Sequence, residues 1–200
     1  MGIRHITQLA AFGKGYEVQI SETCVEENPV ELITHVAVTP SAGSDAKATI
    51  PAIDALEDAG HKPEELTADT TYSGATNAAE ASKRGVRLLA PAPAMGKPEP
   101  GEVYPAPAAK CPESPQKAGE WLRQQEAAPE FKKRYAIRAG IEATNSELKR
   151  VQGLGKLRVR REKRVKLAVY LKAAGCNLRR ALRYWTQTPT TVLETAALPA

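Results

Sequence analysis

Prolines divide this chain into two parts that must fold differently. Eight of its 15 prolines lie between residues 91 and 115. Proline removes a backbone donor and restricts the residue before it, so this stretch predicts a linker rather than a packed element. The chain is expected to comprise five segments: 1–14 without an assigned element, 15–90 with strands and helices, 91–128 as the linker with a short helix, 129–185 as long helices, and 186–200 as a disordered tail.

The first part reads as alternating strands and helices. Apolar runs predict strands at residues 16–20, 32–39, 64–68 and 86–90. Helical patterns run over about 50–60 and 75–83, ending near Gly60 and Gly85. Because the later strands are separated by helices, this order predicts an α/β fold with a mixed sheet.

The second part reads as helical. The pattern predicts a short helix at 120–126, a long one from Pro129 to about residue 151, and another over 157–185. The last helix has a regular apolar stripe that predicts its buried face. The stripe consists of Leu167, Leu171, Ala174, Leu178, Leu182 and Trp185.

Positive charge is concentrated in the second part. The 200-residue chain has a net charge of +5, but residues 132–183 hold 17 lysines and arginines against three acidic residues. This excess favours a polyanionic partner, most plausibly nucleic acid, over the alternative of a merely solvated helical face. The expected DNA-binding residues are Lys156, Arg158, Arg160, Arg161, Lys163 and Arg164.

Several classes of protein are not indicated. No run approaches 18 apolar residues, so no membrane span is expected, and the first residues lack a signal-peptide pattern. Cys24, Cys111 and Cys176 are odd in number and widely spaced, which argues against a disulfide scaffold. We therefore expect a reduced, cytoplasmic protein.

Two groups of polar residues could carry chemistry. Asp69 directly follows a predicted strand, at the sheet edge where open α/β folds place their sites, although turns also favour Asp. Tyr135, Arg138, Glu142 and Lys149 fall within about 60° of each other on a helix. From periodicity alone, an ordinary amphipathic helix with one ion pair is the favoured explanation of this second group.

The spacing Tyr-x2-Arg-x3-Glu-x6-Lys resembles the signature around the catalytic glutamate of bacterial insertion-sequence transposases. Those enzymes have an Asp–Asp–Glu (DDE) triad on a ribonuclease-H-like fold. The segments GYEVQISETC, SAGSDAKATIPAI, ADTTYSG, RAGIEATNSELKRVQGLGKLRVRR and LAVYLKAAGCNLRRALRYW are similar to one branch of that family in the same order. The resemblance covers residues 15–94 and 131–185.

The resemblance implies a function and a site. Asp69 matches the second catalytic Asp and Glu142 the catalytic Glu, and these two would hold Mg²⁺ in a two-metal site for strand cleavage and transfer. Tyr135, Arg138 and Lys149 match supporting positions of the signature. The implied partner is double-stranded DNA at insertion-sequence ends, with no membrane involved. The resemblance leaves open whether the protein forms a homodimer.

The chain also departs from the family pattern. The first catalytic Asp should lie on a first strand before GYEVQ, yet no acidic residue precedes Glu17. The N-terminal DNA-binding region is not recognised, and the insertion before the catalytic Glu is short. We therefore expect a truncated, catalytically impaired copy whose sheet lacks its first strand.

Two alternatives to a truncated, catalytically impaired transposase remain. The chain could be a non-catalytic basic DNA-binding remnant, or a fragment without a stable fold. Glu17 or Glu22 could also be imagined as substitute metal ligands.

Overall fold

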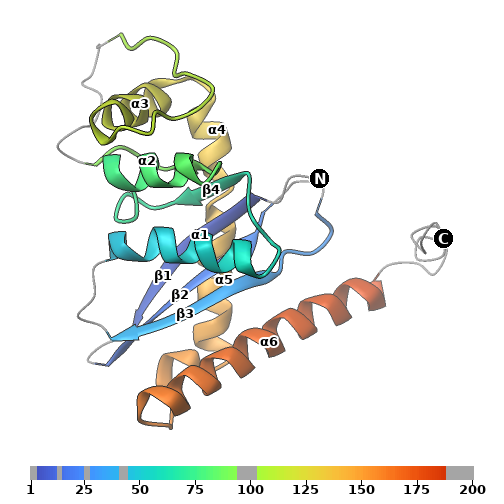
Figure 1. Ribbon diagram of the computed structural model, residues 1–200. Helices are drawn as coiled ribbons and strands as arrows, with labels where there is room; N and C mark the ends of the chain where they lie inside the picture. Colours follow the sequence, from blue (N-terminus) through green and yellow to red (C-terminus); the bar gives the residue numbers. More distant parts are fainter. Residues whose placement is uncertain (1–3, 13–14, 25–27, 41–44, 94–102, 188–200) are drawn as a thin grey trace.

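A five-stranded mixed sheet forms the centre of the molecule (Figure 1). The computed structural model describes residues 4–12, by their backbone, and residues 15–24, 28–40, 45–93 and 103–187. The strands are β1 (Arg4–Phe12), β2 (Tyr16–Thr23), β3 (Ile33–Pro40), β4 (Glu65–Ala68) and β5 (Arg87–Leu89). Their order is β3-β2-β1-β4-β5; β1 to β3 are antiparallel, and β4 and β5 run parallel to β1.

The central strand β1 corrects the expectation that residues 1–14 lack an element and that the sheet lacks its first strand. β1 pairs with β2 along eight residues, from His5 opposite Thr23 to Phe12 opposite Tyr16. The connection is Gly13-Lys14-Gly15, a short glycine-containing link of the kind that joins hairpin strands. That link, between two apolar runs, was the signal that sequence analysis overlooked.

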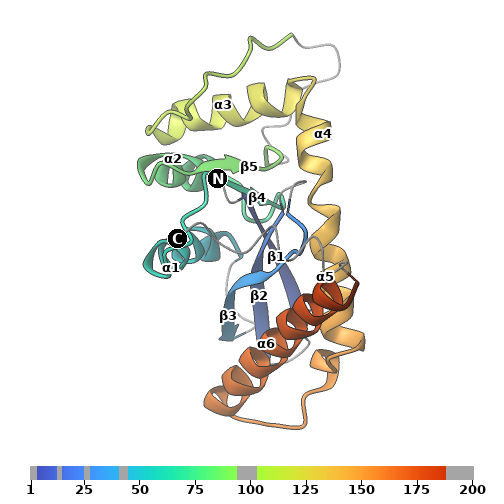
Figure 2. The same ribbon diagram turned by 90° about the vertical axis from the view of Figure 1, so that its right-hand side faces the viewer.

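Helices cover both faces of the sheet (Figure 2). On one side lie η1 (Asp45–Ala48), α1 (Thr49–Asp58), α2 (Ala75–Lys83) and, packed on α2, α3 (Pro115–Ala127). On the other lie α4 (Phe131–Ala136), α5 (Ala139–Arg150), η3 (Leu154–Lys156) and α6 (Glu162–Gln187). The predicted mixed α/β class is confirmed, as are the four predicted strands and the helices α1 and α2. No helix within the described parts of the chain is long and apolar enough to cross a membrane.

Each face of the sheet has its own apolar core. Leu66 and Leu88 pack with residues of α1, α2 and α3, including the fully buried Trp121. Val18 and Ile20, two residues apart on β2, pack with α5 and α6. Since successive side chains of a strand point to opposite faces, this spacing of two directs both to the same layer.

The helix predicted from Pro129 to residue 151 is interrupted once, between α4 and α5. The amides of Arg138, Gly140 and Ile141 each bond to the carbonyl three residues earlier, at 3.0–3.2 Å. Such tightened turns inside a helix occur at hinges and at functional sites. The interruption lies within the Tyr135–Glu142 part of the signature and sets the direction of α5 relative to α4.

The helix α6 buries a different face from the one predicted. Its buried residues are Val165, Val169, Ala173 and Cys176. The five large residues of the predicted stripe, from Leu167 to Trp185, are instead between 47% and 65% exposed. The helix carries two apolar stripes, and the one with smaller side chains allows α6 to lie close to β3 and α5. The predicted tail beyond Gln187 lies outside the described residues.

A buried polar network ties β2 to α5 and α6. The carboxylate of Glu22, which is fully buried, accepts hydrogen bonds from Thr144 Oγ1 at 2.5 Å and from Arg180 Nη1 at 3.2 Å. Arg180 also donates to the Glu31 carbonyl at 3.0 Å and to Glu147 Oε2 at 3.1 Å. Buried charges need partners of this kind, because an unpaired one costs several kcal/mol, on the order of 3–5.

Glu22 is expected to make the stability of the protein fall as the pH rises. Burial raises the pKa of Glu22 above 4.5, although the Thr144 hydrogen bond and the Arg180 charge oppose this. Between pH 4.5 and the higher folded-state pKa, the folded protein therefore binds more protons than the unfolded chain, and stability decreases with pH. Gln does not titrate, so the Glu22→Gln variant does not lose this stability. The difference between its free energy of unfolding and that of the wild type (variant minus wild type) should therefore rise with pH through this window and then level off.

Urea unfolding at a series of pH values measures this difference. Glu57→Gln is the matched control, because Glu57 pairs with Lys62 on the exposed face of α1. It should change stability by less than about 0.5 kcal/mol. A Glu22→Gln difference that is independent of pH would contradict the pKa assignment.

Candidate functional site

Asp69 lies at the carboxyl end of β4, beside the central strand β1. The β1–β4 pairing ends with Thr7 opposite Ala68, so Asp69 is the next residue after the paired segment. Its backbone carbonyl accepts the amides of Tyr72 and Ser73 at 3.0 and 3.2 Å, which closes a tight turn toward α2. The turn leaves the Asp69 carboxylate at the sheet edge on the side of α4 and α5.

Arg138 joins Asp69 to Glu142. Its Nη2 donates to Asp69 Oδ2 at 3.0 Å and its Nη1 donates to Glu142 Oε1 at 3.3 Å. The Arg138 side chain is 15% exposed, whereas that of Glu142 is 62% exposed. A single planar guanidinium thus brings together two carboxylates that are far apart in the sequence, one from the sheet and one from the first turn of α5.

Tyr135 packs near the Arg138 guanidinium. Its ring stacks on Phe131, with ring centroids 5.2 Å apart and planes at 11°. The guanidinium carbon of Arg138 lies 5.7 Å from the Tyr135 ring centroid, within the range of a cation–π contact. The structure therefore brings together Tyr135, Arg138, Glu142 and Asp69, while Lys149 lies two helical turns farther along α5 at an exposed position.

The donor set does not fit a two-metal site. Asp69 and Glu142 supply two carboxylates, and a guanidinium lies between them. In the described parts of the chain no three His, Cys, Asp or Glu side chains are grouped so that they could hold a metal ion. The β1 sequence, RHITQLAAF, contains no acidic residue either.

Glu17 and Glu22 do not complete the set. Glu22 is engaged by Thr144 and Arg180 in the network described above. Glu17 lines a small hollow beside α1, together with His35 and Lys47, on the opposite face of the sheet from α5. The idea of a substitute ligand therefore finds no support in the positions of these two residues.

The predicted DNA-binding residues form one exposed basic segment, residues 156–164, between η3 and the first turn of α6. All six are exposed, and no ion pair is seen for any of them among the described residues. Arg161 adopts a left-handed backbone conformation with φ of 72°, which is unusual for a residue other than glycine. Glu162, the acidic residue inside the segment, pairs with Lys166 at 2.7 Å.

Other arginines of the charged block are engaged within the protein. Arg134 pairs with Glu65, Arg138 with Asp69 and Glu142, and Arg180 with Glu22 and Glu147. These ion pairs balance the charges of the arginines in the folded state. The arginines are therefore less available to bind a polyanion than the exposed residues of the basic segment. The residue count therefore overestimated the free positive charge, and the basic segment is one exposed part of the charged block.

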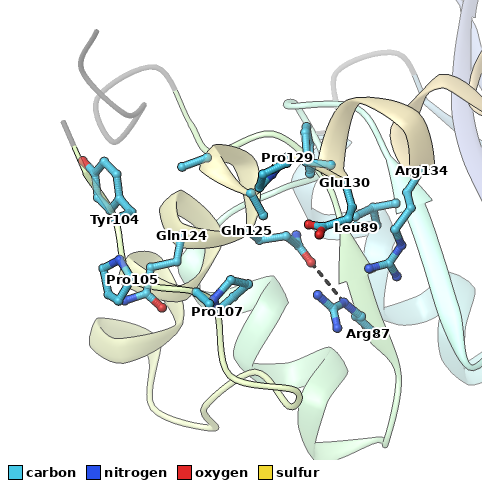
Figure 3. Close-up of a pocket in the computed structure, with 14 residues that line it drawn as sticks. Arg87, Leu89, Tyr104, Pro105, Pro107, Gln124, Gln125, Pro129, Glu130 and Arg134 are labelled. Atoms are coloured by element: carbon cyan, nitrogen blue, oxygen red, sulfur yellow. Dashed lines mark hydrogen bonds between the residues drawn. The ribbon is translucent and has the colours of Figure 1, made fainter. Parts of the chain in front are cut away.

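A cavity of about 430 Å³, which the sequence did not indicate, lies next to α4 (Figure 3). It is lined by Arg87, Tyr104, Gln125, Pro129 and Arg134, among others. Arg87 Nε donates to Gln125 Oε1 at 3.1 Å, and burial together with the nearby Arg134 lowers the pKa of Arg87. The lining residues come from β5, the following loop, α3 and α4, so no sequence spacing could have indicated them.

Comparison with known proteins gives one family match. Residues 109–182 match the family model of a transposase DDE domain. This segment, which is less than half of the chain, is thus similar to transposase DDE domains. The matched segment contains Tyr135, Arg138, Glu142 and Lys149 as well as the basic segment, whereas Asp69 and the sheet precede it. Among curated proteins, no match is found.

The environment of Tyr135 predicts how its phenol titrates. Burial raises the pKa of Tyr135 above its usual 10.0, and the positive charge of Arg138 opposes this rise. Replacement of Arg138 by Gln should therefore raise the pKa of Tyr135 further. Tyrosinate absorbance as a function of pH, taken as the difference from Tyr135→Phe, measures it.

Lys133→Gln provides the matched control for this titration. It removes one positive charge from an exposed position on the same helix. It should leave the pKa of Tyr135 nearly unchanged, because an exposed charge is screened by water and salt. Equal effects of the two variants would contradict a direct Arg138–Tyr135 contact.

Proposed function

We propose that this protein is a transposase-type protein that binds double-stranded DNA at insertion-sequence ends, and that its site for metal-dependent strand cleavage and transfer is incomplete. One observation carries the proposal. Asp69, which precedes the segment matched by the transposase DDE domain, contacts Arg138, which lies within that segment and also contacts Glu142. Three residues expected from the resemblance thus meet at one sheet edge.

The same proposal extends to the fold. A mixed sheet with an acidic residue at the end of β4 and a glutamate-bearing helix on one face is what a ribonuclease-H-like transposase core requires. β1 supplies the backbone of the strand on which the family carries its first catalytic Asp. Gln8 follows Thr7 in β1 as Asp69 follows Ala68 in β4, so Gln8 lies at the register position beside Asp69.

Incomplete catalysis follows from the chemistry of the donor set. Two-metal phosphoryl transfer needs carboxylates that hold two Mg²⁺ ions about 4 Å apart and stabilise the attacking and leaving oxygens. Asp69 and Glu142 provide only part of such a set, and the single positive charge of Arg138 is shared between them. Loss of one member of a catalytic unit typically lowers the rate by orders of magnitude.

DNA binding is assigned to the basic segment. Arginines and lysines that neutralise about six phosphates give a log–log dependence of affinity on salt with a slope of about −5. Fluorescence anisotropy of a labelled duplex over a salt series measures this slope. Replacing Arg158, Arg160 and Arg161 by Ala should flatten it by up to about three units.

The control variant is Lys62, Lys83 and Lys110 all replaced by Ala. It removes the same charge from exposed lysines on the side of α1, α2 and α3. It should leave the slope within about one unit of the wild type, because the lost charges lie outside the basic segment. Binding that is insensitive to salt, or equally weakened by both variants, would contradict the assignment.

The protein is expected to cleave DNA no faster than a variant without the two carboxylates. A plasmid-nicking assay with Mg²⁺ or Mn²⁺ compares the wild type with the Asp69→Ala, Glu142→Ala double variant. Equal rates are expected, because neither protein can assemble a bridging carboxylate set. Metal-dependent nicking by the wild type that the double variant lacks would overturn the impaired-site proposal.

A gain-of-function variant separates an incomplete site from a non-catalytic remnant. Gln8→Asp places a third carboxylate at the register position beside Asp69 and should bind Mn²⁺ more tightly than the wild type in a titration calorimeter. Gln8→Asn, of similar shape to Asp but uncharged, is the matched control. No gain with Gln8→Asp would favour a remnant that binds DNA without any latent metal site.

A further inference from the structure

The outer face of α6 is an exposed apolar stripe along an ordered helix. Its large side chains are Leu167, Leu171, Leu178, Leu182 and Trp185, each about half exposed. The helix lies along β3 and α5 (Figure 1) and packs on them with its opposite face. The exposed stripe therefore faces away from these elements. An extended apolar surface of this kind on a folded domain marks an interaction site.

We propose that the stripe binds a second copy of this chain, with the two α6 helices antiparallel about a twofold axis near residue 176. This inference is independent of the proposed DNA function. A twofold interface must be complementary to itself. The stripe meets that condition, because its positions fall in pairs around residue 176: 167 with 185, 171 with 182, and 174 with 178.

Side-chain size suits the same arrangement. At the centre, Ala174 of one copy would lie opposite Leu178 of the other, and the reverse, so that each large side chain meets a small one. Ala174 is itself exposed, and Gly175 follows it. Small residues at the crossing point allow the two helices to approach closely.

Charge favours an antiparallel over a parallel pair. Lys163 and Lys166 lie at the beginning of α6, whereas its last turn holds no basic residue. An antiparallel pair places Lys163 beside the carbonyl end of the partner helix, where positive charge is stabilising, whereas Lys166 is already paired with Glu162. It also separates Lys166 from its symmetry mate by about 30 Å, well beyond the screening length, whereas a parallel pair brings them together.

The other flank of the stripe carries little free charge. Lys172 donates to the carbonyl of Gln152, and Arg179 pairs with Glu147 in α5. Both side chains are thereby turned toward their own chain. The charges of Lys172 and Arg179 are therefore directed away from the stripe.

Analytical ultracentrifugation of the full chain tests the proposal. We expect a concentration-dependent change from the 21.5 kDa monomer to a species of twice that mass. Replacing Leu171 and Leu178 by Glu should weaken association by at least about 100-fold, because it removes two central anchors. The matched control replaces Val103 and Val151 by Glu, exposed apolar residues outside α6, and should leave association unchanged.

Cysteine cross-linking tests the direction of the helices. Under mild oxidation, a mixture of Leu171→Cys and Leu182→Cys proteins should form mixed disulfide dimers, and each protein alone should form few. Far-ultraviolet circular dichroism confirms that each variant is folded.

Three results would overturn the proposal. The first is a monomer at every concentration, which would assign the stripe to another segment or protein. The second is association that survives Leu171→Glu with Leu178→Glu, and the third is cross-linking of Leu171→Cys with itself in preference to Leu182→Cys.

Discussion

The largely buried guanidinium of Arg180 sets the arrangement on which the candidate site depends. It reaches Glu22 on β2 and both Thr144 and Glu147 on α5, so one side chain of α6 holds three elements together. Thr144 and Glu142 are two residues apart, about 200° around a helix. Pinning Thr144 toward β2 therefore turns Glu142 toward Arg138 and the end of β4.

The same polar layer explains why so many charges cancel inside one domain. Each arginine of α4, α5 and α6 that contacts the sheet side meets a carboxylate, as Arg134 meets Glu65 and Arg179 meets Glu147. A buried or half-buried charge without such a partner would strongly destabilise the fold. Between η3 and the first turn of α6, by contrast, the basic residues of the segment 156–164 are exposed and have no ion pair within the described structure.

The candidate site brings four of the expected side chains together but has only two carboxylates among the described residues. Tyr135, Arg138 and Glu142 meet Asp69 because the α4–α5 interruption directs them to the sheet edge. The sequence of β1 contains no acidic residue, and the guanidinium of Arg138 is the cation that the two carboxylates share. The exposed basic segment lies on a different part of the chain, between η3 and the first turn of α6.

Local patterns in the sequence were sufficient wherever short-range constraints decide the outcome. The strands β2 to β5, the helices α1 and α2, and the Tyr135–Glu142 spacing could be read because alternation, glycine stops and helical periodicity are properties of a few consecutive residues. The sequence also showed by itself that no acidic residue precedes Glu17.

Only the tertiary structure decided which surfaces meet. It placed β1 in the centre of the sheet, because strand pairing depends on partners as distant as Glu65 to Ala68. It also chose between the two apolar stripes of α6, burying Val165 and Val169 and leaving Leu171 exposed. Periodicity shows that a helix has an apolar face, but which face is buried depends on the shape and charge of the surface it packs against.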